Sequence, residues 1–386
     1  MSELKKYKLG DLGFFFGGVT SIKKEDYGHG TPFLPYKNVY KNSKVNVNEL
    51  ELMNVRSLDL ERRNAVYGDI FFTASSETPD EVAMSSVLLD EVQNLTFNGF
   101  CKRFRLHDFN TLLPEYARYL FRDISFRREV YQLATGDIRF NISQESLANI
   151  EIEIPNIETQ KEIAQILTSL DDKIEINLQM NQTLEAMAQA IFKEWFVNFN
   201  FPGFDGELVD GLPKGWRKGN LGEIIVFKNG KSSPERSGDF KYPVFGSNGI
   251  IGYSENYNAP ENISIVGRVG SFCGSTYLST KKCWVTDNAI IAQSIKGFSV
   301  YTYLTLLNLN LNNFRAGSGQ PLLNQTILSA IQINIPSDVL LMEFEEHTMT
   351  LFKKIELNLD NINELINTRD TLLPKLMSGQ LAVMNT

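Results

Sequence analysis

Cationic and aromatic side chains alternate in one short segment of the first half of the chain. Residues 100–106 read Phe-Cys-Lys-Arg-Phe-Arg-Leu, and further basic pairs lie at 23–24, 62–63 and 127–128. Lysine and arginine neutralise phosphates and bind guanine, asparagine and glutamine bind adenine, and aromatic rings stack on bases. Any single cluster is more often an ordinary protein surface, so these residues are candidates for nucleic-acid contact only as a set. The candidates outside glycine loops are Lys23, Lys24, Tyr36, Lys37, Lys102, Arg103 and Arg105 in the first half, and Lys231, Ser232, Asn248, Arg268, Lys281 and Lys282 in the second.

Two glycine loops carry the best-positioned candidates. One loop contains Gly136 and the other Gly317, and each precedes a short helical pattern and a strand-like pattern. Loops present side chains and amide groups to a phosphate backbone. It is equally open that the glycines serve backbone turning alone. The candidates are Thr135, Asp137 and Arg139 in the first loop, and Arg315, Ser318 and Gln320 in the second.

Motifs for catalysis or metal binding are missing from the sequence. It has no Asn/Asp-Pro-Pro-Tyr/Phe tetrapeptide of amino-methyltransferases, and a Walker-like segment at 227–233 has Ile225 where a phosphate loop requires glycine. The three histidines stand alone, and the three cysteines form no Cys-x-x-Cys pair. Neither a zinc site nor a disulfide framework is therefore supported. The acidic segment 79–81 lacks the downstream lysine of a nuclease motif. We expect a binding protein with no catalysed reaction, cofactor or metal of its own.

The net charge of −8, from 38 Lys and Arg against 46 Asp and Glu, speaks at first against a nucleic-acid partner. Its distribution changes that conclusion. Residues 213–336 hold 12 basic and 6 acidic residues, a net +6, whereas residues 1–155 carry −3 and residues 156–212 and 337–386 carry −7 and −4. The acidic segments have helical patterns, in which charge is usually a solvated helix face. No apolar run approaches the roughly 18 residues of a membrane helix and no secretory signal is apparent, so we expect a cytoplasmic protein.

An internal repeat governs the organisation of the chain. Segments 135–155 and 316–336 align with an offset of 181, which superposes a glycine, a glutamine, a leucine and three isoleucines in alternating positions. Each copy predicts a glycine loop, a short helix and a strand that ends at a proline. A weaker match between 9–13 and 218–223 has an offset of 209. The chain is therefore predicted to contain the same structural repeat twice.

A long helical pattern follows each proline. Residues 159–197 contain neither Gly nor Pro, and Thr159 with Glu162 predicts a capping box at the start. Apolar residues recur at spacings of four and three, typical of a coiled coil, and the same positions recur 181 residues later. At about 1.5 Å per residue, such a helix is roughly 58 Å long, and packing the two copies on each other buries both stripes. The predicted seam comprises Ile163, Leu167, Leu170, Ile174, Asn177, Asn181, Leu184, Ala188, Ile191 and Trp195 in the first helix, and Phe344, Thr348, Leu351, Ile355, Asn358, Ile362, Leu365, Arg369, Leu372 and Leu376 in the second.

Asn177 and Asn358 occupy equivalent positions in this seam. A polar residue at a core position can fix the register of a coiled coil. We hypothesise that both asparagines are buried and do so, while heptad drift that turns both toward solvent stays an alternative.

The segments 160–196 and 344–381, each with its strand and proline lead-in, resemble the specificity subunit of type I restriction-modification enzymes. The resemblance implies an α+β fold with two α/β-type globular target recognition domains, separated by two long antiparallel helices that form a coiled coil with an internal pseudo-twofold repeat. Each domain is expected to bind one half of a bipartite, asymmetric DNA site. Two modification subunits that hold S-adenosylmethionine and methylate adenine are implied as partners, as are restriction subunits that use ATP and Mg²⁺. The expected segments are a first recognition domain at 1–155, a long helix at 156–198, a linker at 199–212, a second recognition domain at 213–336, a second long helix at 337–378 and a tail at 379–386.

Two other functions remain open from the sequence. The acidic total slightly favours a scaffolding protein, in which paired globular domains bind proteins and the coiled coil sets their separation. A self-contained methyltransferase or nuclease needs catalytic residues that the sequence does not offer. Salt-dependent binding of DNA separates the DNA-binding specificity subunit from the scaffolding protein, because phosphate neutralisation makes DNA affinity fall steeply with salt.

Overall fold

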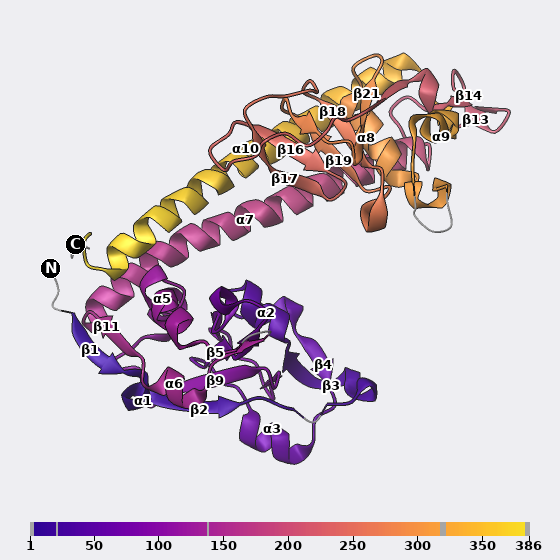
Figure 1. Cartoon of the computed structure of the whole chain (residues 1–386). Coiled ribbons are helices and arrows are strands. Elements are labelled where there is room, and N and C mark those ends of the chain that lie inside the picture. Colours follow the sequence, from indigo (N-terminus) through magenta and orange to yellow (C-terminus); the bar gives the residue numbers. More distant parts are fainter. Residues whose placement is uncertain (1–3, 21, 137–138, 317–321, 383–386) are drawn as a thin grey trace. The chain divides into compact units, whose positions relative to one another are not determined.

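The computed structural model describes residues 4–20, 22–136, 139–316 and 322–382 (Figure 1). The chain divides into two compact units. Unit 1 comprises Met1–Ile174 and Asn363–Thr386, and unit 2 comprises Glu175–Ile362. Each unit combines a globular domain with part of both long helices, α7 (Ile157–Phe196) and α10 (Asp338–Met377).

The globular domain of unit 1 is built on a four-stranded antiparallel sheet in the order β2-β9-β5-β7. Its core is rich in aromatic residues, among them Phe72, Phe104 and Phe121, which are fully buried. A smaller sheet has the order β4-β3-β8. The elements are β1 (Lys5–Lys8), α1 (Leu9–Leu12), β2 (Gly13–Gly17), η1 (Lys24–Asp26), β3 (Tyr27–Leu34), α2 (Tyr36–Lys41), η2 (Val47–Glu49), β4 (Glu51–Met53), α3 (Ser57–Arg63), β5 (Ile70–Thr73), β6 (Ser75–Ser76), η3 (Pro79–Glu81), β7 (Ser85–Val87), β8 (Thr96–Phe97), β9 (Cys101–Leu106), α4 (Pro114–Leu120), α5 (Ile124–Leu133), β10 (Phe140–Asn141), α6 (Gln144–Ala148) and β11 (Glu151–Ile154).

The globular domain of unit 2 has a comparable plan. A four-stranded antiparallel sheet runs in the order β15-β21-β18-β19, and a three-stranded sheet in the order β17-β16-β20. The elements are β12 (Leu208–Val209), β13 (Leu212–Pro213), β14 (Arg217–Asn220), η4 (Leu221–Glu223), β15 (Ile225–Asn229), β16 (Tyr242–Gly246), β17 (Gly249–Ser254), β18 (Ile263–Gly267), η5 (Gly270–Phe272), β19 (Thr276–Ser279), β20 (Trp284–Val285), β21 (Ala289–Ser294), α8 (Ser299–Asn308), η6 (Leu311–Phe314), α9 (Gln325–Ala330) and β22 (Gln332–Ile335).

The internal repeat is confirmed in three dimensions. Strands β11 and β22 lie 181 residues apart and so do both ends of α7 and α10, which have 40 residues each. β11 pairs with β1 and β22 pairs with β14, both antiparallel. The amides of Leu9 and Leu221 donate to the carbonyls of Ile150 and Ile331 at 3.0 and 2.9 Å. Leu9 therefore corresponds to Leu221, an offset of 212. The offset of 209 expected from the sequence is wrong, because strand pairing and not the short glycine motif sets the register.

The first long helix also begins differently from the expectation. Its first residue is Ile157, and the Asn156 side-chain oxygen accepts the amide of Thr159 at 2.9 Å. Asn156 therefore caps the helix, and the proposed Thr159 cap lies inside the first turn.

Within each unit the two long helices run side by side in opposite directions (Figure 1). In unit 1 the beginning of α7 packs with the end of α10, where Ile163, Leu167 and Leu376 share one buried core. In unit 2 the end of α7 packs with the beginning of α10. There the ring of Phe196 lies 4.8 Å from that of Phe344 and 4.9 Å from that of Tyr301 on α8. All seam residues predicted from the sequence are buried or half-buried.

The two seam asparagines differ from each other. Asn358 is 1% exposed and donates from Nδ2 to Oδ1 of Asn181 at 2.8 Å. Asn177 is half-buried. The polar pair in the seam is thus Asn181 with Asn358, and the expectation that Asn177 and Asn358 act alike is corrected.

Candidate nucleic-acid interface

A cavity of about 400 Å³ opens on the globular domain of unit 1. Its lining joins aromatic rings, hydroxyl groups, carboxylates and one cation. The lining residues are Tyr36, Tyr40, Ser75, Ser76, Glu77, Glu81, Phe100 and Arg139. We name this the Tyr36 cavity.

Strand pairing brings these residues together from distant parts of the sequence. β6 pairs with β10, so that Ser75 faces Asn141 and Ser76 faces Phe140. The Tyr36 hydroxyl donates to the carbonyl of Ser75 at 2.8 Å. Tyr36 and the exposed Arg139, which belong to separate sequence-predicted groups, therefore line one cavity. Asp137 lies outside the described residues, and Thr135 is exposed next to the loop.

Glu81 organises the polar wall of the Tyr36 cavity. Its two carboxylate oxygens accept hydrogen bonds from the hydroxyls of Tyr40 and Ser76, each at 2.7 Å. The bond from Tyr40, followed by that from Ser76, lowers the pKa of Glu81, so it carries a negative charge at neutral pH. The rings of Tyr36 and Tyr40 lie nearly parallel, 11° apart with centroids separated by 6.4 Å. Tyr40, Glu81 and Phe100 were missed as site residues, although Phe100 opens the basic and aromatic segment.

Two arginines of that segment have structural partners. Arg103 is 3% exposed and donates to the carbonyl of Asn64 at 2.7 Å. Arg105 forms a bidentate ion pair with the buried Asp69, with distances of 2.7 and 2.6 Å. Both lie on β9, a central strand of the main sheet. The expectation that they contact nucleic acid is therefore corrected, because burial and pairing occupy them within the domain. Lys102, on the same strand, is half-buried.

The remaining candidates of unit 1 lie at the surface. Lys23 and Lys24 are exposed at η1, and Lys37 is exposed on α2 next to Tyr36. None of these three forms an ion pair within the described ranges. Their charges are available to a partner.

In unit 2 three candidates converge from separate segments. Asn248 is exposed in the turn between β16 and β17, and Arg268 follows β18. A side chain at Gly267 would place its Cβ 2.8 Å from the carbonyl oxygen of Ser247, so the turn packs directly on the strand end. Bridges from Leu322 to Val269 and Ala316 bring the exposed Arg315 to the same region. Ser318 and Gln320 lie outside the described residues.

The lysines of unit 2 differ in their availability. Lys231 and Ser232 are exposed beyond β15, and Lys282 is exposed with its ammonium 4.9 Å from the ring centre of Tyr257. Lys281 instead binds the carboxylate of Asp360 on α10 at 2.5 Å. Lys281 is exposed and ties its loop to the long helix through this pair, and a DNA contact at Lys281 stays a prediction.

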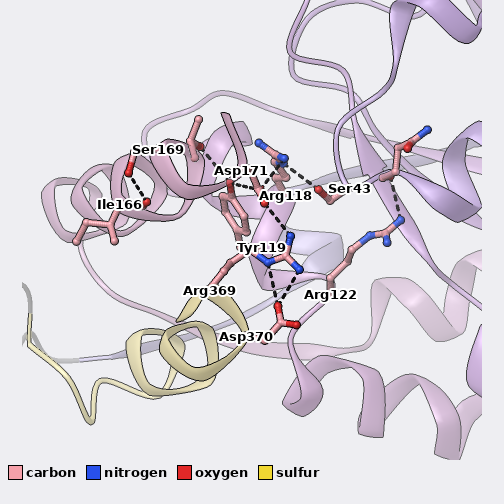
Figure 2. Close-up of polar contacts among 11 residues, drawn as sticks. Ser43, Arg118, Tyr119, Arg122, Ile166, Ser169, Asp171, Arg369 and Asp370 are labelled. Carbon is pink, nitrogen blue, oxygen red and sulfur yellow. Dashed lines mark hydrogen bonds and ion pairs between the residues drawn. The ribbon is translucent and has the colours of Figure 1, made fainter. Parts of the chain in front are cut away.

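In unit 1 the domain is fixed to both long helices through Asp171 of α7 (Figure 2). Asp171 accepts Arg118 of α4 at 2.7 Å, the hydroxyl of Tyr119 at 2.8 Å and Arg369 of α10 at 2.8 Å. The side chains of Asp171 and Arg118 are 12% and 10% exposed. Low exposure strengthens these interactions, so the domain has a defined orientation on the helix pair within this unit.

Unit 2 attaches its domain through different residues. Glu345 of α10 accepts hydrogen bonds from the Ser299 hydroxyl and from the amides of Val300 and Tyr301, which form the first turn of α8. Tyr303 donates to Glu185 of α7 at 2.7 Å. Burial, and then the bond to Glu185, raise the pKa of the Tyr303 hydroxyl. In both units the globular domain is therefore bound to both long helices, but through different residues.

The long helices also expose apolar side chains at equivalent positions. Ile176 and Leu178 on α7 are 57% and 40% exposed, and Leu357 and Leu359 on α10, 181 residues later, are 59% and 47% exposed. The exposure of these apolar side chains thus recurs with the internal repeat.

Comparison with known proteins identifies the family. A family model described as type I restriction modification DNA specificity domain matches residues 1–186 and 213–365. The chain belongs to this family. The specificity subunit of the type I restriction enzyme MjaIX from Methanocaldococcus jannaschii is 26% identical over 70% of each chain. That of HindI from Haemophilus influenzae is 25% identical over 99% of this chain and all of its own.

A solved structure shares the fold of this specificity subunit. The S subunit of a type I restriction-modification system from M. genitalium has a TM-score of 0.61 and 19% identity, and the alignment covers 100% of this chain and 97% of the other. In the described part of the specificity subunit, no helix is long and apolar enough to cross a membrane. Over the same residues, no group of three or more His, Cys, Asp or Glu side chains could hold a metal ion.

Proposed function

We propose that each globular domain recognises one half of a bipartite, asymmetric DNA site, and that the helix pair sets the separation of the two halves. The observation that carries the proposal is the repeat itself. Two domains of the same plan each lead through a strand and a proline into a helix of 40 residues. Two similar binding domains joined by a rod suit a target with two separated blocks.

The exposed cations supply contacts to phosphates. In unit 1 they are Lys23, Lys24, Lys37 and Arg139, and in unit 2 they are Lys231, Lys282 and Arg315. Sequence selectivity then comes from the Tyr36 cavity in one domain and from Asn248 and Arg268 in the other, since amides and guanidinium groups form directional bonds with base edges. The second domain, at +6, is expected to bind DNA more strongly than the first, at −3.

Two methyltransferase subunits are the proposed partners on the long helices. The support is the pair of exposed apolar positions, Ile176 with Leu178 and Leu357 with Leu359, which offers the same contact twice. The specificity subunit itself catalyses no step in this proposal. S-adenosylmethionine belongs to the modification subunits, which methylate adenine, and ATP with Mg²⁺ belongs to the restriction subunits of the full complex.

Mapping methylated adenines tests the proposal. DNA is exposed to this chain together with its modification subunits and then sequenced for modified bases. We expect two short specified blocks around an unspecified spacer. A single contiguous site contradicts the two-domain geometry.

Helix length provides a second test. Seven residues are inserted into each helix at equivalent points, after Gln179 and after Asp360. This adds about 10 Å to the rod, so the spacer should lengthen by up to about three base pairs. An unchanged spacer contradicts the role of the helices as a ruler, while the two specified blocks remain as a control.

A further inference from the structure

We propose that the Tyr36 cavity binds a nucleobase that has left the duplex stack and that carries an exocyclic amino group: adenine, cytosine or guanine. The inference rests on the proposed function, because it takes DNA as the ligand of the domain. It adds a binding site for one base within the half-site recognised by unit 1.

The shape and rings of the cavity favour an extruded base. A base edge inside a duplex is met by a convex element that enters a groove, whereas an extruded base needs a pocket in which it is stacked against side chains. The cavity of about 400 Å³ is such a pocket. Tyr36 and Tyr40 supply parallel rings in its wall, and Phe100, which is 58% exposed, stands at its rim. An exposed aromatic ring at the rim is placed to fill the gap that a departing base leaves.

The charges favour a base inside the cavity and a phosphate outside it. Glu77 and the half-buried Glu81 line the cavity, and in the described ranges neither carboxylate forms an ion pair. Two carboxylates repel a phosphate. The cation of the lining is Arg139, which is exposed. It can therefore hold the phosphate beside the extruded base.

Glu81 explains the choice of an amino-bearing base. Each of its oxygens already accepts one hydroxyl, from Tyr40 and from Ser76. A hydrogen bond from the Thr78 side chain also contributes to the lowered pKa of Glu81. Of the four lone-pair sites of the carboxylate, at least one is therefore free to accept a further hydrogen bond. An exocyclic amino group at the edge of the base donates such a bond, whereas the single ring N3–H of thymine lies between two carbonyl oxygens, which the carboxylate repels.

Mismatched duplexes test the inference with the complex of this chain and its modification subunits. At each position of both half-sites, only the complementary base is changed, and the dissociation constant is measured. Weakening a base pair lowers the cost of extrusion, so we expect one amino-bearing base of the half-site bound by unit 1 to give about tenfold tighter binding when mismatched. Mismatches at positions recognised by their edges weaken binding or leave it unchanged.

Variants of the cavity then separate this site from base extrusion by the methyltransferases. Phe100→Ala should abolish the gain at that position, and Glu81→Gln should abolish the preference for the amino-bearing base over thymine. Tyr131→Ala, at an exposed tyrosine of α5 outside the cavity, and Glu61→Gln on α3 are the matched controls and should retain both. A gain that persists in both cavity variants, or the absence of any such position in a complex that still methylates a bipartite site, overturns the inference. A complex without any bipartite specificity contradicts the proposed function instead.

Discussion

The asparagine pair in the helix seam offers a quantitative test of the packing in unit 2. Asn358 is buried, and its Nδ2 lies 2.8 Å from Oδ1 of Asn181. Leucine at 358 removes the donor and leaves the Oδ1 of the half-buried Asn181 without a partner. An unsatisfied buried polar group costs about 1–3 kcal/mol, so we expect Asn358→Leu to lower the free energy of unfolding of unit 2 by about 2 kcal/mol. The double variant Asn181→Leu/Asn358→Leu removes both polar groups and should recover the loss to within about 1 kcal/mol.

Tryptophan fluorescence measures this effect directly. All three tryptophans, Trp195, Trp216 and Trp284, belong to unit 2. With a urea dependence of about 2 kcal/mol per M, a loss of about 2 kcal/mol lowers the midpoint by about 1 M. Asn177→Leu is the matched control at the equivalent half-buried position and should change stability by no more than about 0.5 kcal/mol. A wild-type midpoint for Asn358→Leu, or a double variant that equals the sum of the single variants, refutes the reasoning.

Three further predictions follow from other contacts. Asp171→Ala leaves Arg118 buried without its partner and should destabilise unit 1 by about 3–5 kcal/mol, seen as faster hydrogen exchange in α4. The control Glu153→Ala, which breaks an exposed ion pair with Lys6, should lower the stability of unit 1 by less than about 1 kcal/mol. Equal losses in the two variants would argue that the Asp171 contacts do not stabilise the unit. Burial and then a hydrogen bond to Glu115 raise the pKa of Tyr67 to about 12, so the stability it contributes is present below pH 10 and is lost as the pH rises from about 10 to 12. Absorbance at 295 nm should show this late ionisation disappear in urea, and complete titration of the native protein near pH 10 would contradict it. Replacing both Lys231 and Lys282 by alanine should lower the slope of log DNA affinity against log salt concentration by nearly two in magnitude. Replacing Lys281, which is bound to Asp360, should change this slope little.

Local patterns in the sequence were sufficient to predict the long helices, the strands that precede them and the repetition of both. A run without Gly or Pro and with apolar spacings of four and three predicts a long helix, and both helices appear within two residues of the expected ends. The alternating isoleucines at the ends of segments 135–155 and 316–336 correspond to β11 and β22. These patterns depend on neighbours in the chain, so they can be recognised in one dimension.

The candidate site depended on contacts that a local pattern does not contain. The alternation of cations and aromatics at 100–106 indicated a binding surface, but β9 is a central strand, and the ends of Arg103 and Arg105 are held by Asn64 and Asp69. Lys281 is exposed, but it is paired with the carboxylate of Asp360, 79 residues away. In each case a partner distant in sequence decides whether a charge is free.

The sequence by itself determined that this specificity subunit contains an internal repeat, that a long helix ends each copy, and that positive net charge is confined to the second globular domain. Tertiary structure alone decided which asparagine pairs in the seam, which cations remain exposed, and that Tyr36 and Arg139 share a cavity. The physical reason is the range of the interactions. Helix and strand periodicity arises from adjacent residues, whereas burial, ion pairing and the shape of a cavity arise from segments that meet only after the strands have paired.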